Sequence, residues 1–189
     1  MKIIFLDIDG VICTHRMHVS GLAKKYRGDG LVKDGDAWMT DFDPVSCGLL
    51  LRICQEHKNV KIVLSSYWRL FNKDYNLFLA RLETYCPELI DYLLMPNEEY
   101  PEIYRTPDLI NGRRDWEIST WLQRYSSVLG VDNYVIIDDE DFRDKINETH
   151  KGHFVKCDMY EGFGFSDFLK CEEIFGADTE NDKNDAEIR

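Results

Sequence analysis

The sequence has no excess of basic residues. Its 189 residues contain 23 Lys and Arg against 35 Asp and Glu, which gives a formal net charge of −12 at pH 7. A protein that coats nucleic acid non-specifically needs a positive surface, so this balance argues against that function. The acids are enriched between Glu172 and Arg189, and the rest of the chain is therefore less acidic than the total suggests.

Closely spaced cysteines and long apolar runs are also missing. The six cysteines form no C-x-x-C pair, whereas zinc sites and disulfide scaffolds usually show tighter clustering, so we interpret them as reduced thiols. No N-terminal signal pattern precedes the first apolar segment, and no apolar run reaches a membrane-spanning length. We therefore expect a cytoplasmic protein with no membrane partner, and a chain of this length fits one domain.

Apolar runs alternate with amphipathic segments along most of the chain. The pattern predicts buried strands at 2–6, 60–64, 89–95, 134–137 and 153–156. It predicts helices at 44–57, 71–85, 115–125, 141–148 and 166–174, with Trp116 and Trp121 on the apolar side of their helix. Strands that alternate with helices indicate an α/β fold, with a doubly wound, mostly parallel sheet and helices on both faces.

Two segments interrupt this alternation, and a third follows it. Residues 13–40 lack clear periodicity and are rich in Gly and basic residues, which predicts an inserted flap that is either a solvated loop or steers substrate. Residues 96–112 carry Pro and Glu and predict an irregular loop, on which Tyr100 and Tyr104 could stack a base. We expect a single domain over 1–175 and a disordered acidic tail over 176–189.

Polar side chains end three of the predicted strands. Asp7 and Asp9 follow the first, Ser65 and Ser66 the second, and Asp138-Asp139 the fourth along the chain. In an open parallel sheet, ligands bind beyond the carboxyl ends of the strands, so we expect these groups to meet. Each could instead only end a strand or cap a helix.

The types of these residues suit phosphoryl transfer. A carboxylate can act as nucleophile through an aspartyl-phosphate, and further carboxylates provide the oxygen ligands that Mg²⁺ prefers. Arg113 or Arg114, at the start of the helix predicted at 115–125, could neutralise the transferred phosphate. Arg69 either forms a surface salt bridge or contacts the substrate.

Three short motifs resemble those of the haloacid dehalogenase (HAD) superfamily: the first at 6–11 (Leu-Asp-Ile-Asp-Gly-Val), the second at 63–66 (Val-Leu-Ser-Ser) and the fourth at 136–139 (Ile-Ile-Asp-Asp). Longer segments at 42–44, 61–69 and 114–122 are similar to the HAD domains associated with nucleic-acid repair proteins, including the phosphatase halves of polynucleotide kinase-phosphatases. The resemblance covers roughly residues 1–169.

The resemblance implies a role for each matching residue. Asp7 would be the nucleophile. Asp9 would protonate the leaving oxygen, then activate water, and its main-chain carbonyl would bind Mg²⁺. Asp139 would be a direct Mg²⁺ ligand with Asp138 in support, and Ser65 would hydrogen-bond a phosphate oxygen.

The third motif of the superfamily is usually a lysine, and no lysine stands in the matching place. Arg114, or else Arg113, would take over its charge. We predict that Ser65, Ser66, Arg69 and Arg113 bind the substrate, while Asp7 and Asp9 join Asp138 and Asp139 at the metal.

The function that follows is a Mg²⁺-dependent phosphomonoesterase that acts on nucleotides or nucleic-acid ends. Neither insert is long enough for a large cap domain, so we expect an open site that admits bulky substrates. The alternative enzyme is a phosphatase of small phosphorylated metabolites. The alternative outside enzymes is a non-catalytic phosphate-binding or adaptor protein. The substrate, its 3′ or 5′ phosphate and the oligomeric state remain open.

Overall fold

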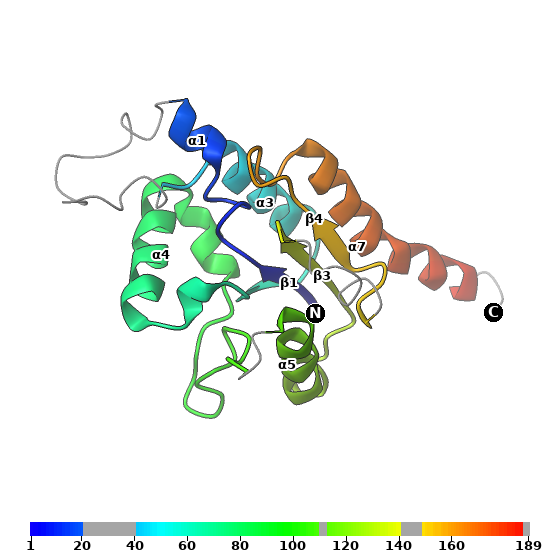
Figure 1. Ribbon diagram of the computed structural model, residues 1–189. Helices are drawn as coiled ribbons and strands as arrows, with labels where there is room; N and C mark the ends of the chain where they lie inside the picture. The colour runs from blue at the N-terminus through cyan, green and yellow to red at the C-terminus, as the bar shows by residue number, and fades with distance from the viewer. Residues whose placement is uncertain (21–40, 110–112, 141–148, 187–189) are drawn as a thin grey trace.

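The computed structural model of the chain describes residues 1–20, 41–109, 113–140 and 149–186 (Figure 1). The helix predicted at 141–148 and most of the flap predicted at 13–40 lie outside the described residues. In the part that is described, no helix combines the length and the apolar character needed to cross a bilayer.

A four-stranded, all-parallel sheet forms the centre of the fold. Its strands are β1 (Lys2–Leu6), β2 (Val60–Leu64), β3 (Asn133–Asp138) and β4 (Phe154–Lys156), in the order β2-β1-β3-β4. The register places Leu6 opposite both Leu64 and Ile137, so that β1 and β2 end at the same level and β3 ends one residue further on. The predicted doubly wound α/β fold is confirmed.

Helices cover both faces of the sheet. Among the described residues, the helices are α1 (His15–Val19), α3 (Pro44–Glu56), α4 (Asn72–Tyr85), α5 (Arg114–Leu129) and α7 (Phe165–Ala186). The same residues include the 3₁₀ turns η2 (Tyr67–Arg69) and η3 (Pro87–Tyr92). Figure 1 shows α5 on the opposite side of the sheet from α3 and α7. Helix α7 extends beyond residue 174, where the sequence pattern ends it, and reaches into the segment expected to be disordered.

Side-chain alternation along β1 explains the two layers. Ile4 and Leu6 are buried in one core with side chains of α3, α4 and α7. Ile3 and Phe5 point to the other face and pack in a second core with Trp121 of α5. A strand that is apolar at every position is therefore buried on both sides, as its sequence predicted.

The strand predicted at 89–95 is wrong. Pro87 begins the 3₁₀ turn η3, which buries Leu89, and only Leu93 forms a bridge with Ile62 of β2. Proline presets the backbone angle of a helical turn, which an apolar run by itself does not reveal.

The burial predicted for Trp116 is also wrong, whereas that of Trp121 is confirmed. Trp121 is fully buried and Trp116 is 46% exposed. The two residues are five positions apart, so a helix of 3.6 residues per turn points them in different directions.

Candidate active site

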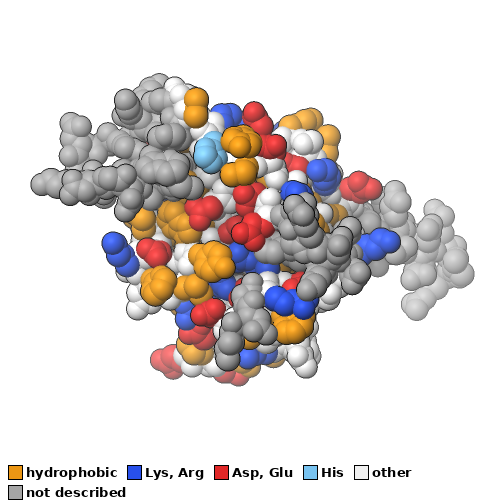
Figure 2. All heavy atoms as spheres, viewed as in Figure 1, with side chains coloured by type: hydrophobic (Ala, Val, Ile, Leu, Met, Phe, Trp, Pro, Cys, Tyr) orange, Lys and Arg blue, Asp and Glu red, His pale blue; other side chains and the backbone are white. Residues whose placement is uncertain are grey.

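The site lies at the carboxyl ends of β1, β2 and β3. The amide of Asp7 donates to Ile137 O at 3.0 Å, and the amide of Ser65 donates to Leu6 O at 2.8 Å, so the sheet hydrogen bonding continues into the site. Asp138 is the last residue of β3. On this face of the molecule, acidic side chains gather near the middle and hydrophobic side chains flank them (Figure 2).

Three carboxylates lie close enough to hold one cation. Asp7, Asp138 and Asp139 can each offer one oxygen, and these oxygens lie within 4.8 Å of one another. Asp7 and Asp138 are buried and Asp139 is half-buried. Such a set of hard oxygen ligands suits Mg²⁺.

Gly10 leaves the space that Asp139 occupies. Its φ of +70° is in the left-handed region, and a methyl group at this position would overlap the Asp139 carboxylate and lie 2.8 Å from its Cβ. The first motif therefore supplies both the acid Asp7 and the gap into which an acid from β3 fits.

Burial and mutual repulsion raise the pKa values of carboxyl groups in this cluster. Burial, together with the charges of Asp7 and Glu140, raises the pKa of Asp139 to about 6. Burial and Asp7 also raise the pKa of Asp138, although Arg114 opposes the shift. A divalent cation would offset this repulsion, so the electrostatics fit a metal site.

The carboxylate of Asp9 is hydrogen-bonded outside this group of three carboxylates. Trp68 Nε1 donates to Asp9 Oδ2 at 3.0 Å. Burial and the neighbouring Asp7 nevertheless raise the pKa of Asp9 to about 6. A carboxyl group with a pKa near neutrality can exchange protons in both directions, as acid–base catalysis requires.

Of the two candidate arginines, the structure brings Arg114 into the site. Arg114 is the first residue of α5 and is buried, with Nη2 4.0 Å from Asp7 Oδ1 and Nε 3.6 Å from Asp138 Oδ2. Its guanidinium also donates to the carbonyl of Ser65. Burial lowers the pKa of Arg114, but Asp7 and Asp138 outweigh this effect and the net shift is upward.

Arg113 points elsewhere. Its Nη2 lies 2.6 Å from Asp115 Oδ2, and its guanidinium lies 4.0 Å from the centroid of the Trp116 ring. It therefore pairs with its own helix and lies outside the carboxylate cluster. The contact between Arg113 and the substrate stays a prediction.

The two serines of the second motif follow β2 and are both buried. Thr106 Oγ1 donates to Ser65 Oγ at 3.4 Å. The hydroxyl of Ser66 is buried and has no hydrogen-bond partner among the described residues. Ser65 lies next to Arg114, whose guanidinium donates to its carbonyl, and its contact with a phosphate oxygen stays a prediction.

Arg69 is neither a surface residue nor open to the site. Its guanidinium donates to Ser66 O at 2.6 Å and Thr106 O at 2.9 Å, and its Nη2 lies 2.7 Å from Glu117 Oε2. The Arg69–Glu117 pair is almost fully buried. Arg69 thus ties the serine loop to the first turn of α5, which carries Arg114, and this geometry favours positioning over the predicted contact with substrate.

Sequence reasoning missed Trp68, Thr106 and Glu117. Glu117 lies three residues after Arg114 and four before Trp121, and this spacing places it on their side of the helix. This spacing is therefore a sequence signal from which the position of Glu117 could have been predicted. Thr106 lies in a loop without periodicity, and the sequence offers no signal for its contact with Ser65.

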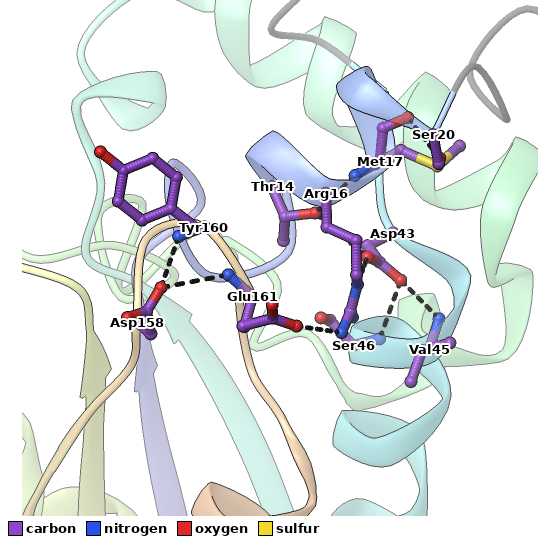
Figure 3. A network of polar contacts seen from close by, with 10 residues as sticks. All are labelled: Thr14, Arg16, Met17, Ser20, Asp43, Val45, Ser46, Asp158, Tyr160 and Glu161. Carbon is purple, nitrogen blue, oxygen red and sulfur yellow. Dashed lines mark hydrogen bonds and ion pairs between the residues drawn. The ribbon is translucent and has the colours of Figure 1, made fainter.

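A second polar network fixes the chain that leaves the first motif (Figure 3). Asp43 Oδ1 caps α3 by accepting from the amides of Val45 and Ser46. Its Oδ2 accepts from Thr14 Oγ1 at 3.0 Å and Arg16 Nε at 2.9 Å.

Arg16 extends this network to the segment after β4. Its Nη1 lies 3.0 Å from Glu161 Oε2, and Asp158 accepts from the amides of Tyr160 and Glu161 (Figure 3). Nearby, Asp41 lies 3.5 Å from Arg81 Nη1 in a buried pair. The chain is thus fixed on both sides of residues 21–40.

The fold is that of the haloacid dehalogenase class of phosphatases. The family model described as the HAD domain in Swiss Army Knife RNA repair proteins matches residues 3–168, and the chain belongs to this family. The resemblance to HAD domains of nucleic-acid repair proteins is thereby confirmed, and the chain carries a phosphatase domain of the HAD type. A search of curated proteins and a search of solved structures found no match.

Proposed function

We propose that the protein is a Mg²⁺-dependent phosphomonoesterase that forms an aspartyl-phosphate on Asp7 and acts on nucleotides or nucleic-acid ends. The observation that carries this proposal is the position of Asp7. Its carboxylate lies 4.0 Å from the cation Arg114 and close to two further carboxylates with which it can share a metal. A phosphate at Asp7 would therefore meet the positive charge of Arg114 and that of the bound metal.

The reaction has two steps. In the first, a carboxylate oxygen of Asp7 forms a bond to phosphorus while the ester bond breaks, and Asp9 gives its proton to the leaving oxygen. In the second, Asp9 takes a proton from water, the water oxygen bonds to phosphorus, and the acyl-phosphate bond breaks. Inorganic phosphate leaves and Asp7 is restored.

The remaining groups act on the charge of the phosphoryl group. Asp7, Asp138 and Asp139 would hold Mg²⁺, which when bound offsets the negative charge of the phosphate oxygens. The guanidinium of Arg114 is held in place by the carbonyl of Ser65. A donor that is already oriented does not need to reorganise as the reaction proceeds.

Two observations support the class of substrate. The family description refers to RNA repair proteins. The net charge of −12 disfavours contacts along a long polyanion. Together they favour a nucleotide or the end of a strand over the interior of a polynucleotide.

The test compares wild type with Asp7→Asn, Asp9→Asn and the control Asp91→Asn on p-nitrophenyl phosphate, with Mg²⁺ and with EDTA. Asp91 is an exposed aspartate far from the site in sequence. We expect Asp7→Asn to abolish turnover, Asp9→Asn to reduce it about 10²- to 10⁴-fold, and Asp91→Asn to leave it unchanged. EDTA should abolish the wild-type activity.

Acid-quenched wild type should carry one phosphoryl group detectable by mass spectrometry, and Asp7→Asn should carry none. Turnover that survives in Asp7→Asn would rule out the aspartyl-phosphate. A panel of nucleotides, 3′- and 5′-phosphorylated oligonucleotides and sugar phosphates then ranks the substrates.

A further inference from the structure

Tyr67 is a large aromatic residue that is left open beside the cation of the site. It directly follows Ser65 and Ser66 and begins the 3₁₀ turn η2. Its side chain is 62% exposed, whereas the next residue, Trp68, is 9% exposed. Arg114 Cζ lies 5.8 Å from the centroid of the Tyr67 ring.

The two tyrosines of the 96–112 loop, in contrast to Tyr67, pack against other aromatic rings. The Tyr100 ring packs against Tyr125 with centroids 5.9 Å apart, and the Tyr104 ring packs against Tyr75 at 4.8 Å. Each of these rings therefore already has an aromatic partner within the fold. Among the described residues, no aromatic ring packs against Tyr67, and the guanidinium of Arg114 lies over its ring.

Arg114 connects this ring to the reacting atoms. The same guanidinium that approaches the Tyr67 ring lies 4.0 Å from the carboxylate of Asp7. In a nucleotide, one sugar joins the phosphate to the base. A nucleotide whose phosphate contacts both Asp7 and Arg114 can therefore extend its base toward the Tyr67 ring.

The backbone around Tyr67 is already ordered. The amide of Arg69 donates to Ser66 O at 3.1 Å, and the amide of Leu70 donates to Tyr67 O at 3.0 Å. The guanidinium of Arg69 binds Ser66 O as well. A stacking surface held in this way loses little conformational entropy when a ligand binds.

We propose that Tyr67 stacks the base of the nucleotide whose phosphate is hydrolysed at Asp7, and thereby selects nucleotides and nucleic-acid ends over phosphate esters without a base. The inference rests on the proposed function and names the residue that recognises its substrate class. Every base has a π face, so the selection is for the presence of a base and tolerates its identity.

The experiment uses Tyr67→Ala, Tyr67→Phe and the control Phe71→Ala. Phe71 is 66% exposed and lies on the same segment, four residues further on. Each variant is assayed on a nucleoside monophosphate and on the ribose phosphate that has the same phosphate linkage but no base. Tyr67→Ala should lower kcat/KM on the nucleotide about 10- to 100-fold, mainly through KM, and leave the ribose phosphate within about twofold.

The matched variants separate stacking from structural damage. Tyr67→Phe keeps the ring and should retain activity close to wild type on both substrates, and Phe71→Ala should do the same. The proposal is overturned if Tyr67→Ala lowers kcat/KM equally on both substrates or leaves it unchanged on the nucleotide. It is also overturned if Phe71→Ala lowers kcat/KM on the nucleotide as much as Tyr67→Ala does.

A measurement of equilibrium binding tests base stacking by Tyr67 independently of the phosphatase mechanism. In an Asp7→Asn background, the same nucleotide should bind about 10- to 100-fold more weakly when Tyr67 is replaced by Ala, and unchanged when it is replaced by Phe. Retained turnover in Asp7→Asn would refute the mechanism and leave this binding difference intact. Loss of the binding difference would refute stacking while the phosphatase activity stands.

Discussion

Replacing Gly10 with alanine tests the contact between the first motif and the metal ligands. Gly10 has φ +70°, and its missing side chain leaves room for the carboxylate of Asp139. In Gly10→Ala the new methyl group would overlap that carboxylate and lie 2.8 Å from the Cβ of Asp139. Carbon atoms in contact normally lie about 3.5–4.0 Å apart.

Rotation of the Asp139 side chain does not relieve this clash, because the Cβ does not move when χ1 changes. The backbone after β3 must shift, and the ligand oxygen moves with it. The left-handed backbone adds a cost of about 1–2 kcal/mol for any residue with a Cβ. We therefore expect a loss of stability larger than that cost and a loss of Mg²⁺ binding.

Gly130→Ala is the matched control. Gly130 caps α5 with φ +61°, yet a Cβ there would meet nothing within 4 Å. It should cost only the left-handed conformation, about 1–2 kcal/mol, and leave the site intact. The two variants thus share the backbone strain and differ in the clash.

Urea unfolding measures the first effect, and the gain in Tm on addition of Mg²⁺ measures the second. Gly10→Ala should be less stable than Gly130→Ala and should show a much smaller Mg²⁺-dependent gain, together with lower phosphatase activity. Equal stability, equal Mg²⁺ response and equal activity in the two variants would refute the assigned packing of Asp139.

Two further predictions follow from buried charges. Glu117→Ala leaves the guanidinium of Arg69 buried without its partner carboxylate. The free energy of unfolding, measured in urea, should therefore fall by about 3–5 kcal/mol. A loss below about 1 kcal/mol would contradict the pairing. The second concerns Asp9 and Asp139, whose pKa values are raised to about 6, above the ordinary value of about 3.9 in the unfolded chain. The folded state therefore holds these protons more tightly, and the metal-free protein should lose stability as pH rises from about 4 to about 6. Mg²⁺ competes with the proton of the proposed ligand Asp139, so its gain in Tm should be larger at about pH 7.5 than at about pH 5. An equal gain at both pH values would count against metal binding by Asp139.

The acids of the site could be predicted because they follow from the sheet. Apolar runs that stop at Asp7, Ser65 and Asp138 must end at one edge once the strands are parallel and in register, as Leu6 is with Leu64 and Ile137. This argument needs only the strand pattern.

The choice between Arg113 and Arg114 could not be made in the same way. Successive residues on a helix point about 100° apart, so the outcome depends on the residue at which α5 begins, and sequence patterns locate helix ends only to within a few residues. The roles of Arg69 and Thr106 depend on a loop that no periodicity describes. These contacts come from tertiary packing rather than from local pattern.

The anchoring on both sides of residues 21–40 has a consequence for engineering. On one side, Thr14 and Arg16 bind Asp43, and on the other Asp41 pairs with Arg81 in the interior. The points where the chain leaves and returns are therefore held by contacts with the described part of the domain. Segments of other lengths and sequences can be grafted between these two points, and assays of the resulting chimaeras would test whether this stretch steers the substrate.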